Sequence, residues 1–445
     1  MKKTFTLFIL ITVLTGQAYP QAWKTVGKTT FSDGEAYSQR IVLLNDVPYV
    51  AYQDLANSRK ATVMKYNGTA WEPVGKKGFT PGQVSSLGLA AGNNTLYVAF
   101  SDAANNNKAS VMKFDGSNWV NVGPAGFTQA RCDVISIDVD NGIPWVALED
   151  VMQNSKITVM KYIGEWTTVG SAGFNTGGLT NVIHLDVENG TPFVAYRDYG
   201  AGYKASVMKF DGNNWVLSGQ QGFTGGTYDS YSGLAVLNGV PYVAGWNADA
   251  KLTVYKFGGS GWSALGTDGI SEGQASSQTL RFSPSGTLHV VFKDAGKSNK
   301  AVLKKFDGNN WLAVGEPLSP GNATNLSLAF SSTGEPYVAY RDEYNMRRTS
   351  VMKYGIFTGI QDVYEKKTVK IYPNPNNGIF SIELPAAISP GAFVEIINLA
   401  GQSVFKSCFT EGPEKRIDLS EKPKGIYLAK VRQGEEVLNT KIVIR

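Results

Sequence analysis

The feature that most constrains this chain is a short motif that recurs along it, with a clear copy, KASVMKFDGSNW, at Lys108 to Trp119. In each copy, alternating β-branched and aromatic residues run into a short turn rich in Asn, Asp and Gly, and most copies leave that turn through a tryptophan. This period of two, together with this turn composition, predicts a β-hairpin. The chain therefore encodes one hairpin many times, and the spacing of the copies determines the architecture.

Tryptophans mark the period of the repeat. They recur every 47 to 49 residues, at Trp23, Trp71, Trp119, Trp166, Trp215, Trp262 and Trp311. One period holds four strand candidates bounded by turn residues: SSLGLAA, TLYVAFSD, KASVMKF and NWVNVG. Four short strands per period without a helical pattern are typical of a propeller blade. A stacked solenoid is the alternative, but it needs a cap at each end, and neither end shows one.

The two ends of the repeat array predict how the ring closes. Seven copies of the first three strands end at Tyr354, and no tryptophan strand follows the last copy. One isolated tryptophan strand, from Trp23 to Gly27, precedes the first blade. We therefore predict an all-β, seven-bladed β-propeller over residues 23–354, in which this N-terminal strand is the outermost strand of blade seven. Such closure protects strand edges that would otherwise stay unpaired.

The N-terminal segment predicts export. It combines Lys2 and Lys3 with an apolar run from Phe5 to Leu14 and with the small residues Gly16 and Ala18. This pattern is typical of a signal peptide, here over residues 1–18. No later stretch reaches the roughly 20 apolar residues that a membrane-spanning helix needs. We therefore expect a soluble, monomeric mature chain without a transmembrane segment.

The charge distribution argues against nucleic acid as a partner. The formal net charge of the chain is +5. Lys2 and Lys3 account for two of these charges, and residues 361–445 account for two more, which leaves the repeat region close to neutral. Proteins that bind nucleic acid need clustered Lys and Arg to replace counterions, and the repeats show no such cluster. The two cysteines, Cys132 and Cys408, lie in different parts of the chain, so we expect no intramolecular disulfide.

From Gly355 the pattern changes. Strands of period two alternate with turns rich in Pro, Asn and Gly, which predicts a linker over residues 355–368 and a small Ig-like β-sandwich over residues 369–445. This segment also carries three motifs that are specific as a set. They are Tyr372-Pro373-Asn374-Pro375 with Gly378, then Gly425-Ile426-Tyr427, and the terminal Lys441-Ile442-Val443-Ile444-Arg445.

Together the three motifs resemble the type A C-terminal sorting domain of the type IX (Por) secretion system of Bacteroidota. The resemblance implies that the type IX secretion machinery is a partner of this segment. It also implies that the segment directs the protein from the periplasm through the outer membrane and is then removed, often with attachment of the cargo to surface lipopolysaccharide. The expected location is the medium or the outer-membrane surface. The resemblance carries no information about the repeats.

Three positions recur in every blade. An aspartate ends the second strand, a lysine or arginine starts the third, and a further lysine lies within the third, after Val-Met in five of the seven blades. The aspartates are Asp54, Asp102, Asp150, Asp198, Asp294 and Asp342, with Asn247 in the fifth blade. The spacing between each aspartate and the following cation favours one of two roles, an ion pair across the hairpin or the capping of a turn. Both are favoured relative to a ring of metal-binding carboxylates. For the Val-Met lysine, we expect the stem to pack beside the tryptophan across the hairpin.

Other candidates for chemistry are weak. The segments that start at Asp138 and Asp186, DVDNG and DVENG, faintly resemble calcium loops, but too few oxygen ligands follow them. The chain has only two histidines, His184 and His289, and they lie in separate blades. Neither a histidine metal site nor a Ser-His-Asp relay is therefore indicated. We expect no metal, no cofactor and no catalytic set.

In a chain of near-copies, specific recognition is expected where the copies differ. The loop after the second strand and the loop between blades emerge on one face of a propeller, and blades four and five place aromatic residues there. We predict a ligand-binding site formed by Tyr199, Tyr203, Tyr228, Tyr231 and Trp246, with Asp229 and Arg197 as polar contacts. Rings with polar tips suit sugars or a partner protein. The alternative is that the rings only cover a loop-side cluster.

Two functional classes follow from these observations. The favoured one is a non-catalytic binding module with a carbohydrate or a surface protein as its ligand, because no acid/base constellation stands out. The other is a secreted glycan-degrading enzyme, a glycosidase or a lyase, for which Asp229 is the residue to test.

Overall fold

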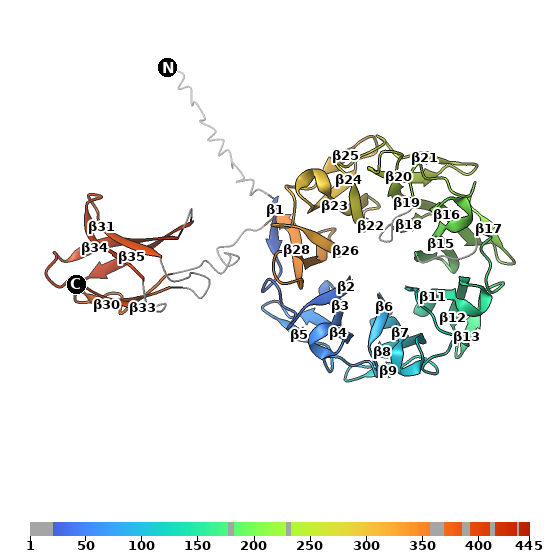
Figure 1. Ribbon diagram of the computed structural model, residues 1–445, viewed down its shortest axis with the longest axis horizontal. Helices are drawn as coiled ribbons and strands as arrows, with labels where there is room; N and C mark the ends of the chain where they lie inside the picture. Colours follow the sequence, from blue (N-terminus) through green and yellow to red (C-terminus); the bar gives the residue numbers. More distant parts are fainter. Residues whose placement is uncertain are drawn as a thin grey trace, which may run out of the picture. The chain divides into compact units, whose positions relative to one another are not determined.

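The computed structural model describes residues 21–176, 182–227, 233–356, 369–384, 392–409, 414–433 and 436–445. The chain divides into two compact units, Met1–Phe357 and Thr358–Arg445, which are described separately. In the first unit, four-stranded antiparallel sheets stand in a ring around a central axis (Figure 1). These sheets are numbered blade 1 to blade 7 by the chain order of their innermost strands. The predicted all-β fold built from four-stranded blades is confirmed.

Blades 1 to 4 each consist of four strands that are consecutive in the chain, ordered from the axis outward (Figure 1). Blade 1 contains β2 (Ala36–Leu44), β3 (Val47–Asp54), β4 (Lys60–Tyr66) and β5 (Trp71–Pro73), and blade 2 contains β6 (Val84–Gly92), β7 (Thr95–Asp102), β8 (Lys108–Phe114) and β9 (Trp119–Asn121). Blade 3 contains β10 (Ile135–Asp140), β11 (Ile143–Asp150), β12 (Lys156–Tyr162) and β13 (Trp166–Thr168), and blade 4 contains β14 (Ile183–Glu188), β15 (Thr191–Asp198), β16 (Lys204–Phe210) and β17 (Trp215–Leu217).

Blades 5 and 6 repeat this order, whereas blade 7 combines both ends of the repeat region. Blade 5 contains β18 (Leu234–Leu237), β19 (Val240–Trp246), β20 (Leu252–Phe257) and β21 (Trp262–Ala264), and blade 6 contains β22 (Ala275–Phe282), β23 (Leu288–Asp294), β24 (Lys300–Phe306) and β25 (Trp311–Ala313). Blade 7 contains β26 (Ala323–Phe330), β27 (Pro336–Asp342), β28 (Arg348–Ile356) and, outermost, β1 (Gln21–Thr25). β1 pairs antiparallel with β28, so that Trp23 lies opposite Tyr354.

Each repeat tryptophan joins its blade to the preceding one. Its indole Nε1 donates a hydrogen bond of 2.5 to 2.9 Å to a backbone carbonyl that lies just past the last strand of the preceding blade. The donor and acceptor pairs are Trp23 and Val314, Trp71 and Val26, Trp119 and Val74, Trp166 and Val122, Trp215 and Val169, Trp262 and Ser218, and Trp311 and Leu265. The first two pairs link blade 7 to both of its neighbours, which makes its contacts equivalent to those of the other blades.

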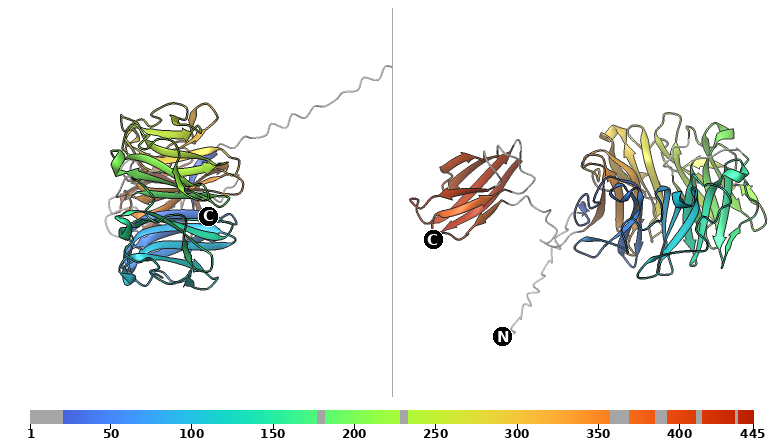
Figure 2. Two further views of the ribbon diagram at one scale, coloured as in Figure 1. Left: turned by 90° about the vertical axis from the view of Figure 1, so that its right-hand side faces the viewer. Right: turned by 60° about the horizontal axis from the view of Figure 1, so that its bottom comes forward.

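The hydrophobic core lies between neighbouring blades. In the views of Figure 2, adjacent blades of the ring stand side by side. One cluster, for example, combines Val50 and Tyr52 of blade 1 with Tyr337 and Ala339 of blade 7. Because each blade buries one face against each of its two neighbours, apolar residues occur on both faces of its strands. The axis of the ring lies outside these interfaces and can therefore hold polar groups.

The Val-Met lysines pack differently from the expectation. Lys161 lies opposite Trp145 of the second strand, with its Nζ 4.9 Å from the centre of that ring, and it does not stack on the hairpin tryptophan. Lys353 lies over Tyr337 in the same way, at 5.3 Å. The register of the second and third strands therefore decides which aromatic ring the lysine covers. A cation over an aromatic face is favourable, and the stem adds apolar contact.

The second unit contains two antiparallel sheets over one core. The three-stranded sheet has the order β29 (Lys370–Tyr372), β30 (Ile379–Glu383) and β33 (Glu414–Asp418), and the four-stranded sheet has the order β32 (Ser403–Cys408), β31 (Phe393–Asn398), β34 (Gly425–Gln433) and β35 (Glu436–Ile444). Phe380 of the first sheet and Val394 of the second belong to one buried cluster. The amide of Asn374 bonds to the backbone of Lys441 and Val443, so two of the three sequence motifs meet in space.

Candidate functional site

The repeated aspartates cap turns. Five of them precede the 3-10 helices η1 (Leu55–Asn57), η2 (Ala103–Asn105), η3 (Val151–Gln153), η4 (Tyr199–Ala201) and η5 (Ala295–Lys297). In blade 2, the fully buried carboxylate of Asp102 accepts hydrogen bonds from the backbone N–H of Ala104 at 3.0 Å and from the hydroxyl of Ser110 at 3.0 Å. Among the described residues, none of these aspartates pairs with the cation that starts the next strand. Of the two alternatives, the capped turn is therefore the correct one.

We expect Asp102→Ala to lower the free energy of unfolding by about 1–3 kcal/mol, because it removes a cap and leaves buried donors without an acceptor. Addition of EDTA should leave the melting temperature of the unaltered protein unchanged. Asp115→Ala, in the exposed turn of the outer hairpin, is the control and should have a smaller effect. A clear drop of the melting temperature in EDTA would restore the metal-binding interpretation of the aspartates.

The acidic segments of blades 3 and 4 also serve as links between blades. The carboxylate of Asp138 accepts a hydrogen bond from the backbone N–H of Val187 at 2.7 Å, and that of Asp186 accepts one from Val236 at 3.0 Å. The described part of the chain contains no cluster of three or more His, Cys, Asp or Glu side chains that could hold a metal ion. These segments therefore act as blade-to-blade contacts in the geometry observed.

The structure brings three of the predicted site residues together in blade 4. Tyr199 lies in η4, and Tyr203 precedes β16 in the left-handed backbone region, with a φ of 63°. Their ring centres are 4.7 Å apart, and the guanidinium of Arg197 lies 5.9 Å from the centre of the Tyr199 ring. Tyr203 is 49% exposed. Arg197, Tyr199 and Tyr203 form what we call the blade 4 platform.

One further predicted site residue, Trp246, lies in the described part of the chain. Trp246 ends β19 of blade 5 and is half-buried, and its indole N–H donates to the carbonyl of Ala275 in blade 6 at 2.7 Å. It therefore packs at the boundary between two blades. Tyr228, Asp229 and Tyr231 lie outside the described residues.

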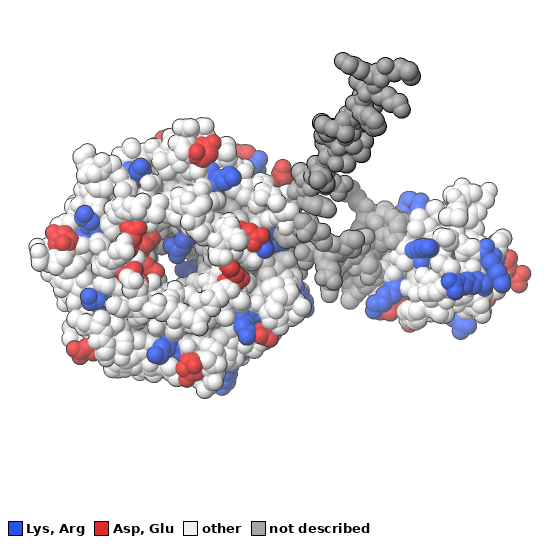
Figure 3. All heavy atoms as spheres, turned by 180° about the vertical axis from the view of Figure 1, so that it is seen from behind, with Lys and Arg blue, Asp and Glu red and all other residues white. Residues whose placement is uncertain are grey.

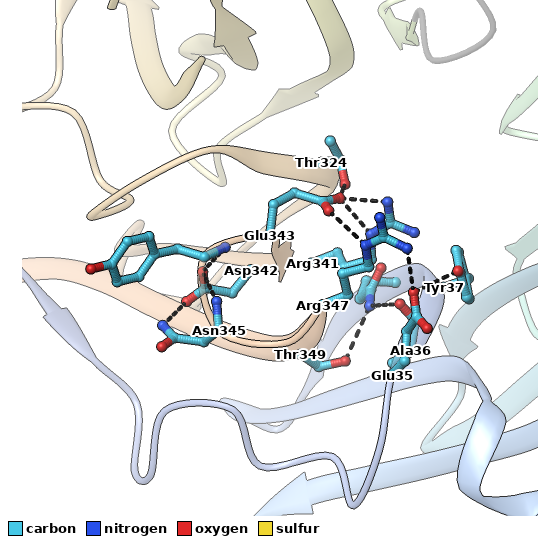
Figure 4. Close-up of polar contacts among 12 residues, drawn as sticks. Glu35, Ala36, Tyr37, Thr324, Arg341, Asp342, Glu343, Asn345, Arg347 and Thr349 are labelled. Atoms are coloured by element: carbon cyan, nitrogen blue, oxygen red, sulfur yellow. Dashed lines mark hydrogen bonds and ion pairs between the residues drawn. The ribbon is translucent and has the colours of Figure 1, made fainter. Parts of the chain in front are cut away.

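In blade 7, the arginine equivalent to that of the platform lies beside an acidic residue, at the boundary with blade 1 (Figure 4). Arg341 occupies the place in blade 7 that Arg197 has in blade 4, and it lies 4.5 Å from the ring centre of Tyr37. Glu343 accepts hydrogen bonds from Arg341 at 2.6 Å and from Thr324 at 2.6 Å. Glu35 of the neighbouring blade holds Arg347 at 3.1 Å. This network links the two blades through their side chains.

Blade 4 differs from blade 7 at the residue after the repeated aspartate. Tyr199 stands where blade 7 has Glu343. The arginine of blade 4 thus lies beside an aromatic platform, whereas Arg341 and Glu343 are both only 15% exposed and bound to each other. The blade 4 position therefore places a partly buried arginine next to two tyrosine rings, of which that of Tyr203 is 49% exposed.

A second candidate site lies on the axis of the ring. A cavity of about 270 Å³ is lined by inner-strand residues from all seven blades. A larger cavity of about 430 Å³ adjoins it, and Arg40 and Arg281 line both. The space-filling view shows the hollow at the centre of the ring, with acidic and basic side chains near its edge (Figure 3). We call the smaller cavity the upper channel and the larger one the lower channel.

The charges of the channel are separated by blade. Arg40 of blade 1 and Arg281 of blade 6 line the channel across from blades 3 and 4, and Asp138 lines the lower channel. Burial, together with the positive charges of Arg40 and Arg281, lowers the pKa of His184 to about 3, which keeps this imidazole neutral. Burial within the ring raises the pKa values of Asp138 and Asp186, and their mutual repulsion adds to the increase for Asp186. The channel therefore has a positive side and a weakly acidic side.

Gln278 is an unusual member of the channel wall. It is 3% exposed, and neither its Oε1 nor its Nε2 has a hydrogen-bond partner among the described residues. Gln39, at the same position of blade 1, donates to Thr349 of the preceding blade. The position equivalent to Thr349 in the blade before Gln278 holds Leu252, which offers no such acceptor. A buried amide without partners costs about 1–3 kcal/mol per group unless water or a ligand satisfies it.

The sequence predictions missed these channel residues. The signal was available in the aligned inner strands, where Arg281, Asp138 and Asp186 occupy a position that holds Val or Ala in the other blades. Arg40 likewise stands in a row of mostly small residues.

Comparison with known protein families supports the prediction for the C-terminal segment. Residues 370–445 match the family of secretion system C-terminal sorting domains (Por_Secre_tail). This match supports a type IX sorting domain in that segment, while the type A assignment stays a prediction. A comparison with curated protein sequences gives no match. No helix within the described ranges has the length and apolarity needed to cross a membrane.

Several solved structures are similar to the chain at low identity. The SapL1 lectin in complex with alpha methyl fucoside is 15% identical, with a TM-score of 0.44, and the alignment covers 66% of this chain and 99% of that one. The six-bladed lectin of Aleuria aurantia is 17% identical, with a TM-score of 0.44, over 66% and 100% of the two chains. A copper-bound fungal alcohol oxidase is 10% identical, with a TM-score of 0.49, over 96% and 99%.

Proposed function

We propose that this protein is an exported, monomeric, seven-bladed β-propeller closed by β1, which acts as a non-catalytic binding module for a carbohydrate or a surface protein. Its proposed parts are a signal peptide at 1–18, the propeller at 23–354, a linker at 355–368 and an Ig-like sorting domain at 369–445. The match of residues 370–445 to secretion sorting domains supports export. The type IX machinery is the proposed partner, and the medium or the outer-membrane surface the proposed location.

The exposed tyrosine of the blade 4 platform carries the binding proposal. Tyr203 is 49% exposed and is held in place by Tyr199 and by its backbone conformation, next to the positive charge of Arg197. A rigid aromatic face beside a cation offers apolar contact and hydrogen bonding at once, and sugar faces and protein side chains both use this combination. In blade 2, the equivalents of Tyr199 and Tyr203 are Ala103 and Asn107, so the platform breaks the symmetry of the ring.

We expect Tyr203→Ala to weaken binding to the ligands of the unaltered protein by tenfold or more on a glycan array and a surface-protein panel. Loss of a central aromatic contact typically costs about 2 kcal/mol or more, which corresponds to such a factor. Tyr344→Ala removes a tyrosine that is 80% exposed in the equivalent loop of blade 7 and serves as the matched control.

Equal binding by Tyr203→Ala and the unaltered protein would mean that the platform only covers the loop. The same samples should be assayed for glycan cleavage. Cleavage products that depend on Asp229 would favour the hypothesis of a glycan-degrading enzyme over that of a binding module.

A further inference from the structure

We propose that the upper channel is a binding site for one small hydroxylated carboxylate of the uronic-acid class, held by Arg40, Arg281 and Gln278. This site is separate from the blade 4 platform and does not depend on the function proposed for it.

The position of the cavity sets the stoichiometry and the size of the ligand. Because all seven blades contribute to its wall, the ring has one such site and not one per blade. Its volume of about 270 Å³ is slightly below the ~300–1,000 Å³ typical of sites for drug-sized ligands. A single monosaccharide unit is of suitable size.

The charge of the upper channel selects an anion. Its charged lining residues are Arg40, Arg281 and Asp133, and the last of these is exposed and paired with Arg131 at 3.3 Å. The field of the two guanidinium groups extends across the cavity, since both lower the pKa of His184. Guanidinium groups bind carboxylates with directional, charge-assisted hydrogen bonds.

The remaining polar side chains of the upper channel differ in whether they already form hydrogen bonds within the protein. The hydroxyls of Ser136 and Ser327 accept hydrogen bonds from the backbone of the next blade, and that of Thr279 donates to it. The amide of Gln278, in contrast, has neither a donor nor an acceptor partner among the residues described. It is buried in the cavity wall and offers one acceptor and two donors to a polar ligand.

The lower channel orients the ligand. Asp138 lines it, and Asp186 takes the same position in the neighbouring blade 4. Carboxylates repel the acid group of a ligand but accept hydrogen bonds from its hydroxyls. A molecule with a carboxylate at one end and hydroxyls at the other therefore matches the arginine side and the acidic side of the channel, and a bare inorganic anion does not.

Calorimetric titration of the full mature chain tests the proposal with three probes. D-glucuronate should bind, and D-glucose, which has the same ring without the carboxylate, should bind at least about tenfold more weakly, because hydrogen bonds to charged groups contribute that much. Arg40→Gln and Arg281→Gln should each weaken glucuronate binding by about tenfold or more. Arg59→Gln, an exposed arginine on a blade 1 loop, is the control and should bind normally.

The third probe, glutamate blocked at both backbone ends, distinguishes the source of the carboxylate. If it binds more tightly than glucuronate and depends on both arginines, the site takes an acidic protein side chain, and the uronic-acid proposal is overturned. Equal binding of glucose and glucuronate, or no binding of either acid, overturns the proposal. Because Arg281 is exposed, its variant should fold even if Arg40→Gln does not. Tyr203→Ala should leave glucuronate binding intact, which separates this test from that of the platform.

Discussion

A mature chain that begins at Lys28 should be less stable than one that begins at Gln21 by several kcal/mol. The deletion removes β1, and with it the hydrogen bonds to β28 and the hydrophobic contacts of Trp23. Loss of one large aromatic side chain from a core costs about 3–5 kcal/mol, and the half-burial of Trp23 places its own share toward the lower end. The deletion also leaves Trp71 without Val26, the acceptor of its indole N–H. Thermal melting and denaturant titration measure the loss.

Two comparisons make this result specific for ring closure. Trp71→Ala removes the equivalent tryptophan of blade 1 but leaves every strand in place, so it should cost less than the deletion. A synthetic peptide of residues 21–27 should restore the melting temperature of the shortened chain in a saturable way, whereas the same peptide with Trp23→Ala should not. Identical melting of the shortened and full chains would refute the role of β1 proposed here.

Deletion of residues 368–445 should abolish delivery to the surface and the medium and leave a folded propeller in the periplasm. The propeller belongs to a compact unit of its own, and residues 370–445 match secretion sorting domains. Cell fractionation, with limited proteolysis of the retained protein, measures both parts of the expectation. Efficient surface delivery of the shortened protein would contradict it.

A point variant in the sorting domain provides a finer version of the same experiment. Gly378 has a φ of 102°, and a Cβ atom there would lie 2.5 Å from the Cα of Ser420, so Gly378→Ala forces the backbone apart. Gly401 has a φ of 79° with nothing within 4 Å of such a Cβ, which makes Gly401→Ala the matched control. We expect retention in the periplasm for the first variant and near-normal export for the second.

The blade architecture could be predicted from sequence because its signals are local and repeated. Each hairpin carries its own alternation and turn residues, and seven tryptophans fix the period. The details that the sequence alone did not decide depend on strand register and on the geometry of the turns. Asp102 could have paired with Lys108 or capped its own turn, and only the folded turn shows its carboxylate between Ala104 and Ser110. The partner of Lys161 was wrongly predicted for the same reason, since strand pairing places Trp145 opposite it.

The candidate sites were less accessible to sequence reasoning. Tyr199 and Tyr203 were found because they are close in sequence and differ from their counterparts in other blades. Arg40 and Arg281 were missed because 241 residues separate them, and only the ring brings both to one cavity. The unsatisfied amide of Gln278 is harder still to predict from sequence. It arises because Leu252 of another blade stands where a hydroxyl-bearing residue would supply a hydrogen-bond partner.

The pairing of β1 with β28 also determines how the ring responds to a mechanical load. Gln21 lies opposite Ile356, so the chain enters one strand and leaves the other at the same end of the pair. Tension between these two points would break the hydrogen bonds one after another, as in peeling, and not all together, as in shear. Traction on the two ends of the repeat region would therefore open blade 7 first and at low force. The joint that yields first to such a load is therefore the one that pairs the two ends of the repeat region.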